Sequence, residues 1–121
     1  MNKQLLVIDD NVDILNIFKL LLSGKGYKVR TSSKGEYTED LINGKNKLPD
    51  LIILDIMLGD KDGRDICKKL KNSPITKHIP IIMISSDLTS KKSSLEANAN
   101  SFIAKPFENE TVIRAIKSYL S

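Results

Sequence analysis

The chain has 121 residues and a formal net charge of +4, with hydrophobic residues at 40% and charged residues at 28%. This length suits one domain, residues 1–121, and excludes two ordinary domains, while the composition excludes a disordered chain. No signal peptide and no membrane span of roughly 20 apolar residues are visible, because the first apolar run holds only about four residues. The single cysteine, Cys67, excludes an intramolecular disulfide, so we expect a cytoplasmic protein.

The basic residues give no sign of a nucleic-acid surface. All 19 of them are spread along the chain, and aromatic residues make up only 5% of the sequence. A surface that binds nucleic acid more often combines clustered basic residues with aromatic side chains that stack on bases. We therefore expect no direct nucleic-acid binding by this domain.

The first half of the chain alternates strand and helix patterns. Residues 5–8 form a continuous apolar run, typical of a strand covered on both faces. Residues 12–23 predict a helix that Asn11 caps and Gly24 ends. Its many apolar positions predict that it is mostly buried: Val12, Leu15, Ile17, Phe18, Leu20 and Leu22. A second strand is predicted at residues 27–31, and a weaker helix at 35–43 ends at Gly44.

The second half repeats this alternation. Strands are predicted at residues 51–54, 81–84 and 101–104, and helices at 64–71, 90–97 and 109–120. Residues 56–63 predict a polar loop, and Ser73-Pro74 a turn. Five strand–helix units in succession predict a parallel sheet with helices on both faces.

Chemically active side chains follow four of the predicted strands. Asp9 and Asp10 end the first, Asp55 the third and Ser85 the fourth, and the fifth runs into Lys105. The carboxyl ends of parallel strands meet at one edge of a sheet, which is where ligands bind in such folds. We therefore expect these residues to form one site.

Three neighbouring carboxylates oppose one another's ionisation, so they predict a bound cation. Their hard oxygens, with no histidine or cysteine beside them, favour Mg²⁺ over Zn²⁺. Lys105 adds a compact positive charge of the kind that holds phosphate. Asp55, alone at the tip of a central strand, is the better candidate nucleophile for phosphoryl transfer.

With these residues in place, the sequence resembles the receiver domain of two-component response regulators over essentially its whole length. The matching stretches are LLVIDDN, PDLIILDIML, DGRDICKKLK, IPIIMISS and SFIAKPF. The resemblance implies a flavodoxin-like (βα)5 fold, doubly wound, with strand order 2-1-3-4-5. It also implies a signalling switch that catalyses only its own phosphorylation and dephosphorylation, and is otherwise not an enzyme.

The resemblance assigns roles to individual residues. It implies that Asp55 is the phosphoacceptor, that Asp10 is the main Mg²⁺ ligand with Asp9 assisting, and that the backbone carbonyl of Met57 is a further ligand. Lys105 corresponds to the lysine that pairs with the phosphoryl group, and the bond to the proline after it is expected to be cis.

Further positions concern switching and hydrolysis. By resemblance, the hydroxyl of Ser85 hydrogen-bonds the phosphoryl group, and Phe102 is the aromatic switch residue. Met57 and Asp87 flank the path of the water that removes the phosphoryl group. The sequence departs from the family at Gly59-Asp60, where Pro-Gly is frequent, but keeps every catalytic group.

The implied partners are a histidine kinase or phosphotransfer protein as donor, and a downstream protein or fused output domain as target. Phosphorylation is expected to change the surface built from the last two helices and the strand between them, and a phosphorylation-dependent dimer is among the implied assemblies. Two alternatives fit less well. A haloacid-dehalogenase-like phosphatase requires a D-x-D-x-[TV] motif that residues 9–13 lack, and a flavodoxin requires a Ser/Thr-rich phosphate loop after the first strand.

Overall fold

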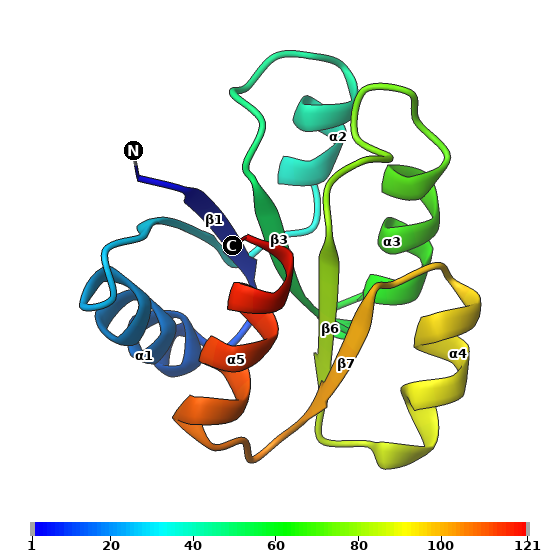
Figure 1. Cartoon of the computed structure of the whole chain (residues 1–121). Helices are drawn as coiled ribbons and strands as arrows, with labels where there is room; N and C mark the ends of the chain where they lie inside the picture. Colours follow the sequence, from blue (N-terminus) through cyan, green and yellow to red (C-terminus); the bar gives the residue numbers. More distant parts are fainter. Residues whose placement is uncertain (1, 121) are drawn as a thin grey trace.

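A computed structural model describes residues 2–120 and shows a central parallel sheet between two helical layers (Figure 1). The strands lie in the order β2-β1-β3-β6-β7, which is 2-1-3-4-5 when only the strands of this sheet are numbered. The flavodoxin-like fold and the strand order predicted from the sequence are therefore confirmed. The strands are β1 (Gln4–Ile8), β2 (Lys28–Ser32), β3 (Leu51–Asp55), β6 (Ile81–Ser85) and β7 (Ser101–Ala104).

Each face of the sheet has its own apolar core. Helices α1 (Val12–Ser23) and α5 (Asn109–Tyr119) cover one face, and α2 (Tyr37–Ile42), α3 (Gly63–Lys71) and α4 (Lys91–Glu96) cover the other (Figure 1). Because successive strand residues point to opposite faces, Leu6 and Ile8 enter one core while Leu5 and Val7 enter the other. The continuous apolar runs of β1, β3 and β6 follow from this double coverage.

Helix α1 begins and ends where the sequence predicts, but its burial differs. The side chain of Asn11 accepts hydrogen bonds from the backbone N–H groups of Asp13 and Ile14, at 2.9 and 3.4 Å. The prediction of a mostly buried helix is wrong, because Val12 and Leu20 are 61% and 79% exposed, and Ile17 is also exposed. Only one face of α1 packs on the sheet, so these apolar residues lie on its outer side.

Two other segments differ from the prediction. The expected loop at 56–63 contains a short antiparallel hairpin of β4 (Met57–Leu58) and β5 (Lys61–Asp62), and Gly63 already belongs to α3. Ile56 and Leu58 are buried in this segment, and Gly59 makes the turn with a positive φ of 63°. The helix predicted at 90–97 is preceded by a single 3₁₀ turn, η1 (Leu88–Ser90), so helical structure begins two residues earlier than predicted.

The remaining helices form close to their predicted positions, although α2 starts two residues later than the expected 35–43. On α3 the residues Ile66, Cys67 and Leu70 are buried, as their spacing predicts. The Cys67 thiol contacts the carbonyl oxygen of Ala97 at 3.4 Å, and burial raises its pKa to about 11, so it acts as a small apolar side chain. Within residues 2–120, no helix combines the length and the apolar character that crossing a membrane requires.

Candidate functional site

Three carboxylates meet at the carboxyl edge of the sheet. Asp9 and Asp10 directly follow β1, and Asp55 is the last residue of the neighbouring strand β3. One carboxylate oxygen from each residue lies within 4.8 Å of the other two. Asp9 and Asp55 are buried, whereas Asp10 is exposed. Oxygens this close can reach one small cation, and the absence of nitrogen and sulfur from the cluster suits Mg²⁺.

Lys105 supplies the positive charge of the site. Its Nζ donates a hydrogen bond to Oδ2 of Asp9 at 2.9 Å and lies 3.5 Å from Oδ2 of Asp55. The lysine directly follows β7, and its backbone N–H donates a hydrogen bond to the carbonyl of Ser85 at 2.9 Å. The sheet therefore fixes the position of the Lys105 backbone. The bond from Lys105 to Pro106 is cis, as expected from the sequence. Asp9 also accepts from the backbone N–H of Asn11 at 2.9 Å.

The carboxyl of Asp55 holds its proton more tightly than an ordinary aspartate. Burial, the main cause, and the adjacent charge of Asp9 raise its pKa from 3.8 to about 6. Lys105 and the backbone N–H of Met57 act in the opposite direction and only partly offset this rise. The site therefore concentrates negative charge that a cation would neutralise, and a cation there would favour the ionised, nucleophilic form of Asp55.

The residues expected to sense the phosphoryl group lie on the two strands beyond β3. Ser85 ends β6, next to β3 in the sheet, and its buried Oγ accepts a hydrogen bond from the N–H of Asp87 at 3.0 Å. Phe102 lies on β7, half-buried against the core beneath α2, α3 and α4. The switching roles of both residues stay predictions.

Met57 and Asp87, expected to tune hydrolysis, have different surroundings. The Met57 side chain is 68% exposed, two residues after Asp55. Oδ1 of Asp87 accepts two hydrogen bonds from Thr89, one from the backbone N–H at 3.0 Å and one from the hydroxyl at 2.6 Å. These hydrogen bonds are the largest cause of its lowered pKa, and they turn its oxygens to the start of η1.

Gly63 packs against the strand that carries Asp55, and Arg64 follows it at the start of α3, although the sequence pattern assigned neither a role. A Cβ on Gly63 would overlap the carbonyl oxygen of Asp55 and stand 2.9 Å from the Cα of Ile56, so only glycine fits there. The Asp-Gly pair at the start of α3 is the one sign of this close approach in the sequence. Arg64 reaches Ser93, 29 residues further along the chain, and no local pattern indicates that contact.

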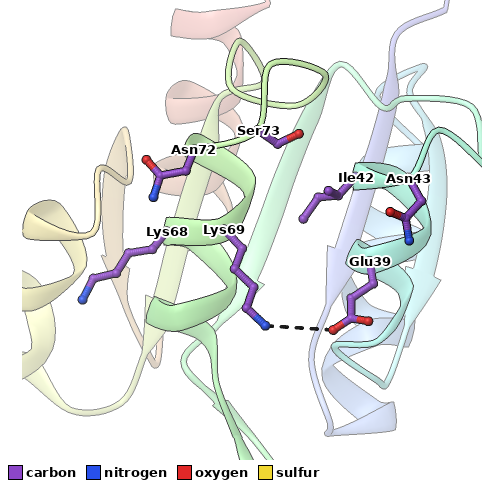
Figure 2. A pocket seen from close by; sticks show the side chains of 7 residues that line it. All are labelled: Glu39, Ile42, Asn43, Lys68, Lys69, Asn72 and Ser73. Carbon is purple, nitrogen blue, oxygen red and sulfur yellow. Dashed lines mark ion pairs between the residues drawn. The ribbon is translucent and has the colours of Figure 1, made fainter.

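A groove of about 490 Å³ lies elsewhere, between the ends of α2 and α3 (Figure 2). Its walls include Ile42, Asn43, Lys68 and Asn72, and an exposed ion pair of 4.0 Å joins Lys69 to Glu39 across it (Figure 2). It shares no residue with the carboxylate site. We therefore assign the chemistry to the edge of the sheet.

Comparison with known families agrees with this geometry. The family described as "Response regulator receiver domain" matches residues 5–117. The chain belongs to this family. Its members are signalling switches of two-component systems, and the acidic cluster at the edge of this sheet is a group that could bind a metal ion.

Individual relatives support the assignment over almost the whole chain. The chain is 36% identical, over 99% of its length, to the alkaline phosphatase synthesis transcriptional regulatory protein PhoP of Bacillus subtilis. Among solved structures, a Chloroflexus aurantiacus protein classed as a response regulator has a TM-score of 0.91 at 35% identity, covering 99% of this chain and 98% of that one. The BeF3-activated DrrB receiver domain has a TM-score of 0.84 at 28% identity, covering 99% and 98%. The chain spans 49% of PhoP, about half of that relative's length.

Proposed function

We propose that residues 1–121 act as one receiver domain that takes a phosphoryl group on Asp55 from a phosphohistidine of a histidine kinase or phosphotransfer protein. In this step the P–N bond to the histidine breaks with its electron pair staying on nitrogen, a P–O bond to a carboxylate oxygen of Asp55 forms, and the imidazole takes up a proton from solvent and leaves neutral. The observation that carries the proposal is the meeting of Asp9, Asp10, Asp55 and Lys105 at one edge of the sheet.

The chain's own residues divide the work of this transfer. Asp55 is the nucleophile, because it is the carboxylate at the tip of the central strand β3. Lys105 would contact the transferred phosphoryl oxygens, since its Nζ already lies 3.5 Å from Asp55. Asp10, Asp9, Asp55 and the carbonyl of Met57 would hold Mg²⁺. Bound there, the ion would neutralise charge on the phosphoryl oxygens.

Phosphorylation would change the surface formed by α4, β7 and α5. Ser85 would turn its hydroxyl to the phosphoryl group, and Phe102, half-buried on β7, would follow it inward. Leu88 and Leu95 are exposed on η1 and α4, at 68% and 43%. An apolar pair on this surface suits a downstream protein, a fused output domain or a second copy in a phosphorylation-dependent dimer.

The donor would approach from α1. Val12 and Leu20 lie exposed on this helix, and Val12 is two residues beyond Asp10 in the acidic cluster. An exposed apolar helix face that starts beside the acidic cluster at Val12 and continues to Leu20 favours a protein partner over a free small molecule. We place this exchange in the cytoplasm, where histidine kinases hold their phosphohistidine.

The direct test is phosphorylation by acetyl phosphate with Mg²⁺, followed by intact mass spectrometry. We expect the mass to rise by one phosphoryl group, and Asp55→Asn to abolish the rise. Asp60→Asn is the matched control, because Asp60 is an exposed acid in the adjacent hairpin and lies outside the cluster. Equal labelling of the Asp55→Asn protein would refute the assignment.

A further inference from the structure

Arg64 joins two parts of the domain that are separate in the sequence. Its Nε lies 2.9 and 3.2 Å from the two carboxylate oxygens of Asp62, and one terminal nitrogen donates to the same carboxylate at 2.5 Å. The other terminal nitrogen donates to Oγ of Ser93 in α4 at 2.9 Å. One guanidinium therefore bridges the start of α3 and the first turn of α4.

The α3 side of this bridge is fixed to the phosphoacceptor. Asp62 caps α3, accepting from the backbone N–H of Arg64 at 2.8 Å. Gly63, between these two residues, packs against the carbonyl of Asp55 and donates to the carbonyl of Ile56 at 2.7 Å. Arg64 is thus positioned relative to the Asp55 backbone with little freedom to move.

The α4 side is held by hydroxyl groups along the helix, and its buried apolar contact is Ala97, the residue directly after the helix. Ser94 is the buried residue of α4, and its Oγ donates to the carbonyl of Ser90 at 2.8 Å. The Oγ of Ser93 donates to the same carbonyl at 3.0 Å while it accepts from Arg64. Because few apolar contacts anchor α4, a single hydrogen bond from a charged group is a large share of what holds it.

The same bonds continue to the residue that would sense the phosphoryl group. Ser90 donates to the carbonyl of Asp87 at 2.5 Å, and the N–H of Asp87 donates to Oγ of Ser85 at 3.0 Å. The charge of Arg64 also attracts the Asp87 carboxylate. A turn of Ser85 toward Asp55 would therefore disturb a series of hydrogen bonds that runs through Asp87, Ser90 and Ser93 to Arg64.

We propose that Arg64 is a positioning residue that ties α4 to the phosphoacceptor, and that loss of its bond to Ser93 releases α4 toward the signalling state. This inference rests on the proposed function, since it takes Asp55 as the phosphoacceptor and Ser85 as its sensor. The tether favours the resting state, so by linkage its removal raises the affinity for a ligand that binds the signalling state.

The test measures the binding of beryllium fluoride with Mg²⁺, followed by fluorine NMR, in variants that keep the carboxylates intact. Ser93→Ala removes the contact without changing charge, and we expect it to tighten binding about three- to tenfold. Ser93→Thr keeps the hydroxyl and should bind like the parent. In an Arg64→Ala background, Ser93→Ala should have no further effect. Unchanged affinity in Ser93→Ala, or an equal gain in both backgrounds, would overturn the tether.

Ser118→Ala is the matched control, because Ser118 also donates to a carbonyl three residues earlier in its helix but, within residues 2–120, accepts no hydrogen bond from an arginine. It should leave the affinity unchanged. Amide hydrogen exchange of the free protein is a second, independent measurement, and Ser93→Ala should speed exchange in α4 but not in α3. If the parent protein binds no beryllium fluoride, the proposed function fails, and hydrogen exchange alone then supports or refutes the tether.

Discussion

Gly63 lies against the backbone of Asp55 so closely that no side chain fits between them. The contact places the start of α3 directly behind the proposed phosphoacceptor, and with it Arg64. A residue with no side chain therefore determines how close the helix comes to the reactive strand.

We predict that Gly63→Ala destabilises the protein by about 1–3 kcal/mol, because the added methyl group must push α3 away from backbone that cannot yield. The measurement is urea unfolding, together with the rate of labelling by acetyl phosphate, which should fall as Asp55 shifts. Gly59→Asn is the control, since Gly59 has open space around it and a positive φ that asparagine tolerates. Equal stability of Gly63→Ala and the parent would contradict this packing argument.

The raised pKa of Asp55 makes stability depend on pH. The folded protein binds this proton more tightly than the unfolded chain, so the favourable contribution is complete below the ordinary pKa of 3.8 and is lost as the pH rises through about 6. Asp55→Asn, which imitates the protonated form, should stabilise the Mg²⁺-free protein by about 1–3 kcal/mol at neutral pH. The gain should be about half as large at pH 5. Urea unfolding at both values checks this, and a gain independent of pH would disprove it.

Lys105 should matter for both the resting charge balance and the reaction. Lys105→Met leaves Asp9 and Asp55 facing each other without a cation, so the pKa of Asp55 should rise further. Labelling by acetyl phosphate should slow by at least about tenfold, because the positive charge beside the phosphoryl oxygens is lost. Carboxyl-carbon NMR titration and the labelling rate are the measurements. Lys92→Met, on an exposed residue, should change neither.

The lifetime of the phosphorylated state should depend on Met57 more than on Asp87. Met57 can shield the phosphorus but cannot orient water, so Met57→Asn should speed loss of the phosphoryl group several-fold. One oxygen of the Asp87 carboxylate already accepts two hydrogen bonds from Thr89, and the charge of the group repels the phosphoryl group, so Asp87→Ala should have a smaller effect. The decay of phosphorylated protein after removal of the donor decides between them. A Met57→Asn decay no faster than that of the parent would reject this account without affecting Asp55.

Much of the architecture could be predicted because it depends on local patterns. The apolar runs at β1, β3 and β6, with the polar residues Asp9, Asp55 and Ser85 at their ends, are enough to place these strands and the edge of the sheet that carries the site. The exposure of Val12 and Leu20 could not be predicted, since apolar spacing does not tell which face of a helix meets the sheet. The hydrogen bond between Arg64 and Ser93 could not be predicted either, because it depends on how α3 and α4 pack in space.

The polar attachment of α4 has a thermodynamic consequence. A rearrangement of this helix breaks hydrogen bonds of Ser90, Ser93 and Ser94 but uncovers little apolar surface, since Ser94 is its buried residue. Heat-capacity changes and denaturant sensitivity both scale with the surface newly exposed to water. The balance between the two positions of α4 should therefore shift little with dilute urea, even though the whole domain unfolds steeply with it, and the enthalpy of the rearrangement should be nearly the same at all temperatures. The logarithm of this balance should then vary linearly with inverse temperature, without the curvature that marks the unfolding of the whole domain.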